Sequence, residues 1–250
     1  MKLFPGEKTP YIFAHRGYSK IAPENTLPAF QEVLNNKVPG IELDIHLCKS
    51  GELVVTHDDN LSRVTGCNAI VEDLSFDEIK KLDAGKWKAQ NFAGTHIPLL
   101  RDLFDLVGNK AYYDIEIKTM KTNKTGITEK LFDLIKLYRL EERCMVSSFN
   151  PMPIKFFKQK APHIPTAIIY SSDKEVPWYL RSGEGKWIAQ TDILKPDHKK
   201  VTKQSMFFNS KIGRRPVIPW TVDDQNEAKR LLDAGVRGII SNDPGNLKIL

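Results

Sequence analysis

The stretch AHRGYSKIAPENTLPAFQEVLNNKVPGIELDIHLCKSGELVVTHD, residues 14–58, decides the fold. It ends one apolar run, YIFAH (11–15), and contains two more, IELDI (41–45) and LVVTH (53–57). Short apolar, β-branched runs of this kind are typical of buried strands. Each run carries ionisable side chains, so these strands bring chemically active groups into the fold.

The second run holds a pair of carboxylates, Glu42 and Asp44, two positions apart. Side chains alternate across a strand, so both project from one face while the isoleucines and leucine of the run face the other way. Two buried like charges are costly, and a shared proton or a bound cation relieves them. Oxygen ligands suit a hard cation such as Mg²⁺ or Ca²⁺. The alternative is an ion pair with Arg or Lys across the sheet.

A later run, AYYDIEIK (111–118), repeats this pattern. Asp114, Glu116 and Lys118 share one face, and Glu116 is a third candidate ligand. Active sites of parallel barrels lie at the carboxyl ends of the strands, and these groups fall late in their runs, as does His15. The sequence therefore predicts that separate strands converge on one site.

Apolar runs and helical periodicities alternate along the whole chain. The runs lie near residues 11–15, 41–47, 111–117, 143–148, 165–170, 186–190, 216–220 and 237–241. Helical patterns lie between most of them, for instance at 26–36, 127–138, 150–160 and 224–234. Eight alternations in 250 residues predict an α/β fold, a single (β/α)8 TIM barrel spanning residues 1–250.

The long segment 58–98 interrupts this alternation. It carries turn residues and one short helical stretch, SFDEIKKL, and it is predicted to be an insertion after the second strand. Such an insertion either covers the barrel mouth and shapes a substrate pocket or is a stabilising surface excursion.

Taken together, the motifs resemble those of the glycerophosphodiester phosphodiesterase family. The matching blocks are HRG (15–17), PENT with AF (23–30), ELD (42–44), KSGELVVTHD (49–58), DAGKW (83–87), IPLL (97–100), DIEIK (114–118), SSF (147–149) and PWTVDD (219–224). Their order and spacing are similar to the family's over almost the whole chain.

The resemblance and the chemistry of the side chains together suggest a role for each candidate site residue. The resemblance implies that His15 and His57 are the catalytic general acid and base, in either order, since histidine titrates near neutrality. Arg16 suits a planar contact with the phosphate, and Lys118 suits a point charge beside it, an ion pair with neighbouring carboxylates, or both. Trp220 either forms an apolar wall for the glycerol carbons or packs in the barrel. One divalent cation, Mg²⁺ or Ca²⁺, is implied at Glu42, Asp44 and Glu116.

The implied activity is metal-dependent hydrolysis of a small glycerophosphodiester to sn-glycerol 3-phosphate and an alcohol. The attacking oxygen is either water or the glycerol 2-hydroxyl, which would form a cyclic phosphate first. Two alternatives are a lysophospholipase D-like phosphodiesterase at a membrane surface, with aromatic residues such as Trp178 and Phe207 on its rim, and a non-catalytic barrel that binds phosphorylated ligands.

At several other positions the sequence allows two interpretations of the side chain's role or departs from the family pattern. His46 shares the face of Asp44 and either touches the site or packs, and Phe149 either joins Trp220 at the pocket or packs in the barrel. Asp58 is expected to anchor a loop. The final block reads GVRGIISNDP, with Asn242 where the family often has an acidic residue.

Composition agrees with an ordinary enzyme of 250 residues, 41% hydrophobic and 27% charged. No apolar stretch is long enough to span a bilayer, and the start MKLFPGEKTP lacks the apolar core of a secretory signal, so a cytoplasmic location without stable membrane insertion is expected. The three cysteines have neither zinc spacing nor a disulfide framework. The net charge of +6 allows weak attraction to anionic lipid. Nucleic-acid binding is not expected, because it would need a denser basic face with interleaved aromatic residues.

Overall fold

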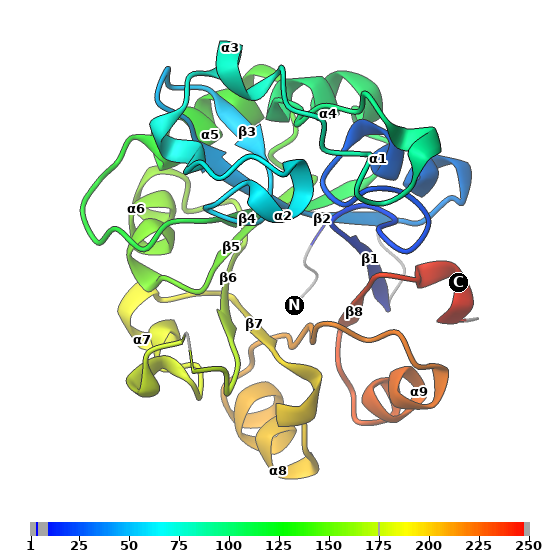
Figure 1. The fold of residues 1–250 in the computed structure, drawn as a ribbon. Helices are drawn as coiled ribbons and strands as arrows, with labels where there is room; N and C mark the ends of the chain where they lie inside the picture. The colour runs from blue at the N-terminus through cyan, green and yellow to red at the C-terminus, as the bar shows by residue number, and fades with distance from the viewer. Residues whose placement is uncertain (1–3, 5–9, 175, 248–250) are drawn as a thin grey trace.

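In a computed structural model of the chain, parallel strands curl into a ring with helices on its outside (Figure 1). The structure describes residues 4, 10–174 and 176–247. Most of segment 1–10, which the sequence predicts not to be a secretory signal, lies outside the described residues.

The strands follow one another around the ring in the order β7-β6-β5-β4-β2-β1-β8, with β3 antiparallel on β2. They are β1 (Tyr11–His15), β2 (Gly40–Leu47), β3 (Leu53–Val55), β4 (Tyr112–Ile117), β5 (Cys144–Ser148), β6 (Thr166–Tyr170), β7 (Ile193–Pro196) and β8 (Gly238–Ser241). The extended stretch 216–222 closes the ring between β7 and β8. Within it, the Ile218 amide donates to Leu194 O at 2.9 Å, and Pro219 O accepts from the Ile240 amide at 3.0 Å. The predicted α/β barrel is confirmed.

The helices lie where the apolar periodicity places them. They are α1 (Leu27–Asn35), α2 (Ser62–Thr65), α3 (Phe76–Ile79), α4 (Leu100–Val107), α5 (Ile127–Leu137), α6 (Pro151–Lys160), α7 (Gly185–Ala189), α8 (Lys203–Met206) and α9 (Gln225–Asp233). Side-chain caps begin two of the long ones: Asn150 accepts from the Met152 amide, and Asp224 accepts from the Glu227 amide. None of the helices in the described part of the chain is long and apolar enough to cross a bilayer.

One predicted strand is wrong. Residues 186–190 fall mostly in helix α7, and the seventh strand of the chain is formed by the residues that follow, as β7. Gly185 opens α7 so close to β6 that an added Cβ would lie 2.8 Å from Ile168 Cδ1. The residues therefore form a short helix on the outside of the ring, buried at Gly185 and Ala189 while Trp187 and Ile188 are exposed. Periodicity over so few residues does not distinguish a strand from a helix.

Buried apolar side chains form a layer across one part of the barrel interior. It is made by Phe13, Met145, Ile193, Ile218 and Ile240, all buried. Outside the ring, alternate side chains of β2 and β4 pack with the covering helices in a second, larger core. Polar groups are thereby confined to the remaining part of the interior.

Next to that apolar layer, a buried ion pair connects β7 with β4 across the barrel interior. Lys195 Nζ on β7 lies 2.6 Å from Asp114 Oδ2 on β4, and it donates to Ser147 Oγ at 3.0 Å. Both charged side chains are at most 1% exposed. Three carboxylates, those of Asp114, Glu42 and Glu116, outweigh the effect of burial and raise the pKa of Lys195, so the ammonium is retained.

Segment 58–98 gathers beside β2 and β3, on one side of the ring (Figure 1). It has a small core of its own, which includes Leu61, Val71, Ile79 and Ile97. This packing fixes α2 and α3 next to the loops that follow β1 and β2.

We predict that the cross-barrel ion pair stabilises the fold only as a pair. Lys195→Met should lower the free energy of unfolding by about 3–5 kcal/mol, because it leaves the Asp114 charge buried without its partner. Adding Asp114→Asn should recover most of the loss. Urea unfolding measures both variants, with Lys158→Met, which breaks a partly exposed pair with Asp192, as a control expected to cost about 1 kcal/mol or less. An equal loss in the control would contradict the prediction.

Candidate active site

The register of β2 and β4 brings the predicted carboxylates together. Asp44 pairs with Glu116 across the two strands, and Glu42 pairs with Asp114. Oxygen atoms of Glu42, Asp44 and Glu116 lie within 4.8 Å of one another, and all three residues are buried. Three hard oxygen donors at this spacing fit a divalent cation, so the predicted ligands form one plausible metal centre.

The HRG turn after β1 wraps around this cluster. Arg16 has a left-handed backbone with φ 56°, and its amide donates to Glu42 Oε2 at 3.0 Å. Gly17 follows with φ 75°, where an added Cβ would lie 2.8 Å from the Ala29 side chain. The glycine is required because no other residue combines this φ with this close approach.

The PENT loop supplies two site residues to which sequence reasoning assigned no role. Asn25 Nδ2 donates to Asp44 Oδ2 at 2.8 Å, and Arg16 Nη1 donates to Glu24 Oε1 at 2.8 Å. The backbone N–H of Asn25 also donates to Arg16 O at 2.8 Å. The loop therefore orients one predicted ligand and the predicted phosphate-binding arginine at once.

Two cations lie against the carboxylates. Lys118 Nζ is 3.0 Å from Glu116 Oε1 and 3.9 Å from Asp44 Oδ1, while Arg16 Nε is 3.5 Å from Asp44 Oδ2. Burial opposes ionisation of Asp44, but His57, Arg16 and Lys118 outweigh it and hold the pKa of Asp44 well below its usual range. Burial, with the charge of Asp44, raises the pKa of Glu42 well above its ordinary value.

An amide orients His15. Its Nδ1 lies 2.7 Å from Asn242 Oδ1, and Asn242 Nδ2 donates to Asp223 Oδ2 at 2.7 Å. Because Nδ2 of Asn242 donates to Asp223, Asn242 presents its side-chain oxygen to His15. His15 Nδ1 is therefore the donor and carries the proton. Nε2 then faces the cluster, 3.9 Å from Glu42 Oε2. Burial, assisted by Arg16, lowers the pKa of His15 to about 4, so the ring is neutral at neutral pH.

A carboxylate orients the second histidine. His57 Nδ1 lies 2.6 Å from Asp58 Oδ1, so Asp58 contacts the imidazole as well as anchoring the loop. His46, buried on β2, has its Nε2 3.2 Å from His57 O and so contacts the backbone of His57 instead of joining the cluster of three carboxylates. His15 and His57 therefore have different partners, the neutral side-chain amide of Asn242 and the carboxylate of Asp58.

Aromatic rings form a wall beside Lys118. Its Nζ lies 5.8 Å from the centre of the Phe149 ring, which meets Trp220 edge to face at 5.6 Å. Trp220 Nε1 donates to Lys195 O at 3.0 Å, which fixes the indole against the strand carrying the buried ion pair. Both rings predicted near the pocket are thus positioned close to a predicted substrate contact.

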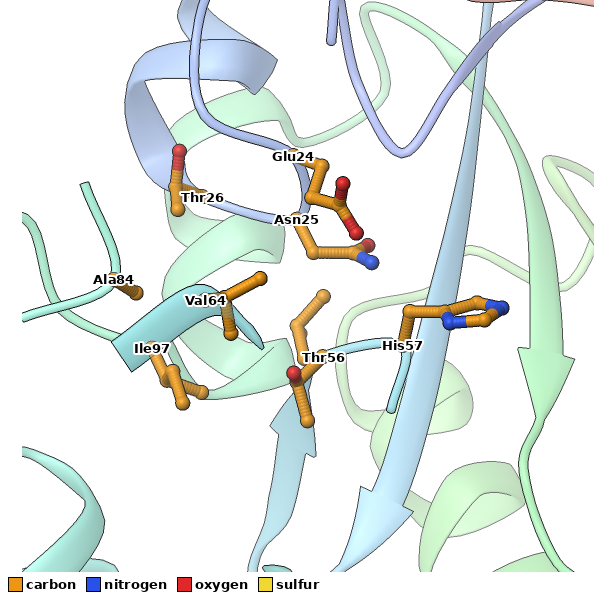
Figure 2. A pocket seen from close by; sticks show the side chains of 9 residues that line it. Glu24, Asn25, Thr26, Thr56, His57, Val64, Ala84 and Ile97 are labelled. Carbon is orange, nitrogen blue, oxygen red and sulfur yellow. The ribbon is translucent and has the colours of Figure 1, made fainter. Parts of the chain in front are cut away.

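A small cavity lies beside His57, between the PENT loop and segment 58–98. Its lining residues are Glu24, Asn25, Thr26, Val55, Thr56, His57, Val64, Ala84 and Ile97. Figure 2 shows His57 and the polar ends of Glu24 and Asn25 at one side of it, and Ala84 and Ile97 at the other.

The structure brings all eight sequence-predicted site residues to the same part of the barrel. Residues that sequence reasoning did not assign to the site join them: Glu24, Asn25, Arg63, Lys195 and Asn242. The PENT motif contained a signal for the first two, since its polar residues precede a helix. Neither Arg63 nor Lys195 had any local signal, because their partners are distant in the sequence.

Comparison with known proteins agrees with this geometry. The model of the glycerophosphoryl diester phosphodiesterase family matches residues 15–246. A glycerophosphodiester phosphodiesterase of Caldanaerobacter subterraneus subsp. tengcongensis is 39% identical over 237 residues, which cover 94% of this chain and 95% of that protein. A glycerophosphodiester phosphodiesterase of Agrobacterium tumefaciens shares the fold, with TM-score 0.80, 21% identity and coverage of 97% of this chain and 100% of that one.

A phosphodiesterase of Oleispira antarctica, solved in complex with the product sn-glycerol-3-phosphate, also has this fold. The TM-score is 0.80 at 25% identity, and the match covers 96% of this chain and 95% of that one.

The neutral His15 predicts a pH-dependent stability. Its folded-state pKa, about 4, lies below the ordinary 6.5, so between these values the unfolded chain binds a proton that the folded chain does not. The free energy of unfolding should therefore fall as the pH drops through this window, with a contribution from His15 of at most about 1.4 kcal/mol per pH unit. Urea unfolding of wild type and His15→Gln across the window measures it. Identical pH slopes for the two proteins would contradict the prediction.

Proposed function

The chain belongs to the glycerophosphoryl diester phosphodiesterase family, and on that premise we propose that it hydrolyses glycerophosphodiesters to sn-glycerol 3-phosphate and an alcohol. The observation that carries the proposal is the convergence of two oriented histidines, two cations and three carboxylates at one part of the barrel. The product bound by the Oleispira antarctica relative supports the same chemistry.

One divalent cation completes the proposed site. Glu42, Asp44 and Glu116 would hold it, and when bound it would polarise a phosphoryl oxygen and neutralise charge that develops there. Arg16 Nε has no hydrogen-bond partner among the described residues, although it is buried. A donor of this kind suits a phosphoryl oxygen of the substrate. Lys118 supplies a further positive charge beside the same carboxylates.

The partners of the histidines suggest their roles in proton transfer. His15 is neutral, with its proton held on Nδ1 by Asn242, so its Nε2 is available to accept a proton from the attacking oxygen. His57 is beside the Asp58 carboxylate, which stabilises an imidazolium, so it is suited to protonate the departing alkoxide. We therefore assign His15 as the general base and His57 as the general acid.

The first test is the release of sn-glycerol 3-phosphate from glycerophosphocholine by the purified chain, with Mg²⁺, with Ca²⁺ and with chelator. We expect metal-dependent release, and we expect His15→Ala and His57→Ala each to lower kcat by about 10²–10⁴-fold, as is typical of the loss of a general acid or base. No release with either metal would reject this substrate class. Full activity in both histidine variants would reject the assigned roles.

Metal binding should also be measurable without turnover. A cation at the acidic cluster should raise the thermal midpoint, since binding at 100 times Kd stabilises the folded state by about 2.7 kcal/mol. Because Glu42 must lose its proton to act as a ligand, we expect the metal affinity to increase with pH. Calorimetric titration of wild type, Glu116→Gln and the control Glu72→Gln measures this. Unchanged affinity in Glu116→Gln would contradict the ligand set.

Hydrolysis of lysophospholipids at a membrane surface is a second candidate, and one observation favours it. Of the large hydrophobic side chains exposed in the described part of the chain, seven lie between residues 178 and 212, including Trp178 at 79% exposure and Phe207 at 51%. Apart from the buried Lys195, residues 171–215 also carry nine basic and five acidic residues, which suits an anionic surface. Parallel assays with lysophosphatidylcholine distinguish the two. A higher kcat/KM on the lysophospholipid would favour this second function.

A further inference from the structure

Arg63, on the short helix α2 of segment 58–98, contacts two carboxylates from different parts of the chain. Its Nε donates to Asp58 Oδ2 at 2.6 Å. Its Nη1 and Nη2 donate to the two oxygens of Glu24, at 3.0 and 2.6 Å. All three nitrogens of the guanidinium are therefore engaged, and the two carboxylates are held at a set separation.

Each of these carboxylates reaches a candidate site residue with its other contacts. Asp58 Oδ1 lies 2.6 Å from His57 Nδ1, and Glu24 Oε1 accepts from Arg16 Nη1 at 2.8 Å. An unbroken chain of polar contacts thus runs from His57 through Asp58, Arg63 and Glu24 to Arg16. It joins the proposed general acid to the proposed phosphate-binding group.

We propose that Arg63 is a positioning residue, which acts through Asp58 and Glu24 to set the orientation of His57 and Arg16 in the site. The inference rests on the proposed function for its catalytic consequence, but the contacts themselves do not. Segment 58–98 then has a defined contribution, since it supplies a cation, Arg63, that binds both carboxylates.

A small cavity lies on one side of His57 and the PENT loop. The cavity in Figure 2 separates His57 and the PENT loop from the apolar side chains of Val64, Ala84 and Ile97. The imidazole is held instead by Asp58, the first residue of segment 58–98, whose Oδ1 lies 2.6 Å from His57 Nδ1. Charge-assisted hydrogen bonds to Arg63 provide directional contacts across the gap.

The other side of Arg63 is also held. Its guanidinium carbon lies 5.8 Å from the centre of the Trp87 ring, in the DAGKW block. Lys88, next to Trp87, donates to Ser19 O at 2.7 Å and so ties this block to the loop after β1. Although the Arg63 side chain is 44% exposed, its position is restricted by the aromatic ring and two carboxylates.

Ionisation of the partners agrees with this arrangement. Burial alone would favour the neutral form of Glu24, but hydrogen bonds from Arg63 and the charge of Arg16 outweigh it and lower the pKa of Glu24. Arg63 and His57 lower the pKa of Asp58 in the same way. Both carboxylates are therefore charged in the pH range where the enzyme would work.

The proposal is tested with Arg63→Met, which keeps an unbranched apolar side chain but removes the guanidinium with its charge and donors. We expect kcat on glycerophosphocholine to fall about 10–100-fold, the usual effect of losing a group that orients an active-site residue. KM should also rise, because Glu24 loses the bonds that help it to orient Arg16, but it should change less than kcat since Arg16 keeps its own hydrogen bond to Glu24. Arg63→Lys should recover only part of kcat, since a single ammonium does not replace the three-nitrogen fork.

Lys121→Met is the matched control. Lys121 also ties segment 58–98 to the barrel, through an ion pair with Glu72, but this pair involves neither His57 nor Arg16. We expect its kcat to equal that of wild type. If Lys121→Met lost as much activity as Arg63→Met, the effect would belong to general attachment of the segment, and the positioning role would be overturned.

Two further measurements separate positioning from stability. In an Asp58→Asn background, Arg63→Met should lower kcat by much less than it does in wild type, because both changes break the same chain of contacts. Added ethylguanidinium should restore part of the activity of Arg63→Ala. Since the Arg63 side chain is partly exposed, its removal should leave a space that the compound can enter from solvent. Full additivity together with no rescue would contradict the proposal.

Nitrogen NMR of the His57 ring tests the contacts without any substrate. In wild type we expect the Nδ1 proton to be held by Asp58, and in Arg63→Met we expect this signal to move or to exchange faster with water. If wild type did not hydrolyse glycerophosphocholine, the proposed function would fail while this comparison still tested the chain of contacts. An unchanged His57 spectrum in Arg63→Met would overturn the inference.

Discussion

The register between β2 and β4 is the constraint on which the rest of the structure depends. It places Glu42, Asp44, Asp114 and Glu116 beside one another in the barrel interior, each no more than 6% exposed. Four carboxylates so close together cannot all remain charged without compensation. The surrounding structure supplies that compensation in layers. Lys195 crosses the barrel from β7 to Asp114, while Lys118 and Arg16 lie against Asp44 and Glu116, and a divalent cation would complete the balance.

This arrangement separates stability from chemistry within one cluster. The Lys195–Asp114 pair is fully enclosed, and Ser147 Oγ bridges it by accepting from Lys195 Nζ and donating to Asp114 Oδ1, so the pair forms a fixed base for the site. The groups next to it are more accessible, with Lys118 17% and His57 30% exposed. The different partners of the two histidines suit different protonation states, because Asn242 carries no charge and Asp58 carries one. A symmetrical pair of partners would not distinguish a proton acceptor from a proton donor.

Much of the barrel could be read from the sequence, because strand and helix periodicity are local properties. The pattern placed β1, β2, β4, β5, β6 and β8 and the long helices correctly, and the alternation within ELD and DIEIK put the ligand candidates on one face. It failed at residues 186–190, where a five-residue apolar run is equally compatible with a strand and a short helix. The close approach that Gly185 allows, against Ile168 of the preceding strand, is a property of packing.

The sequence by itself determined the residue types, their order and their faces, and the family motifs pointed to the chemistry. Only the tertiary structure decided which charges are neighbours. Arg63 and Glu24 are 39 positions apart and His15 and Asn242 are 227 apart, so no local pattern relates them. Their contacts exist because closure of the barrel brings the ends of its strands and loops together. Periodicity encodes which way a side chain faces, whereas its partner across the site is set by the register and closure of the whole sheet.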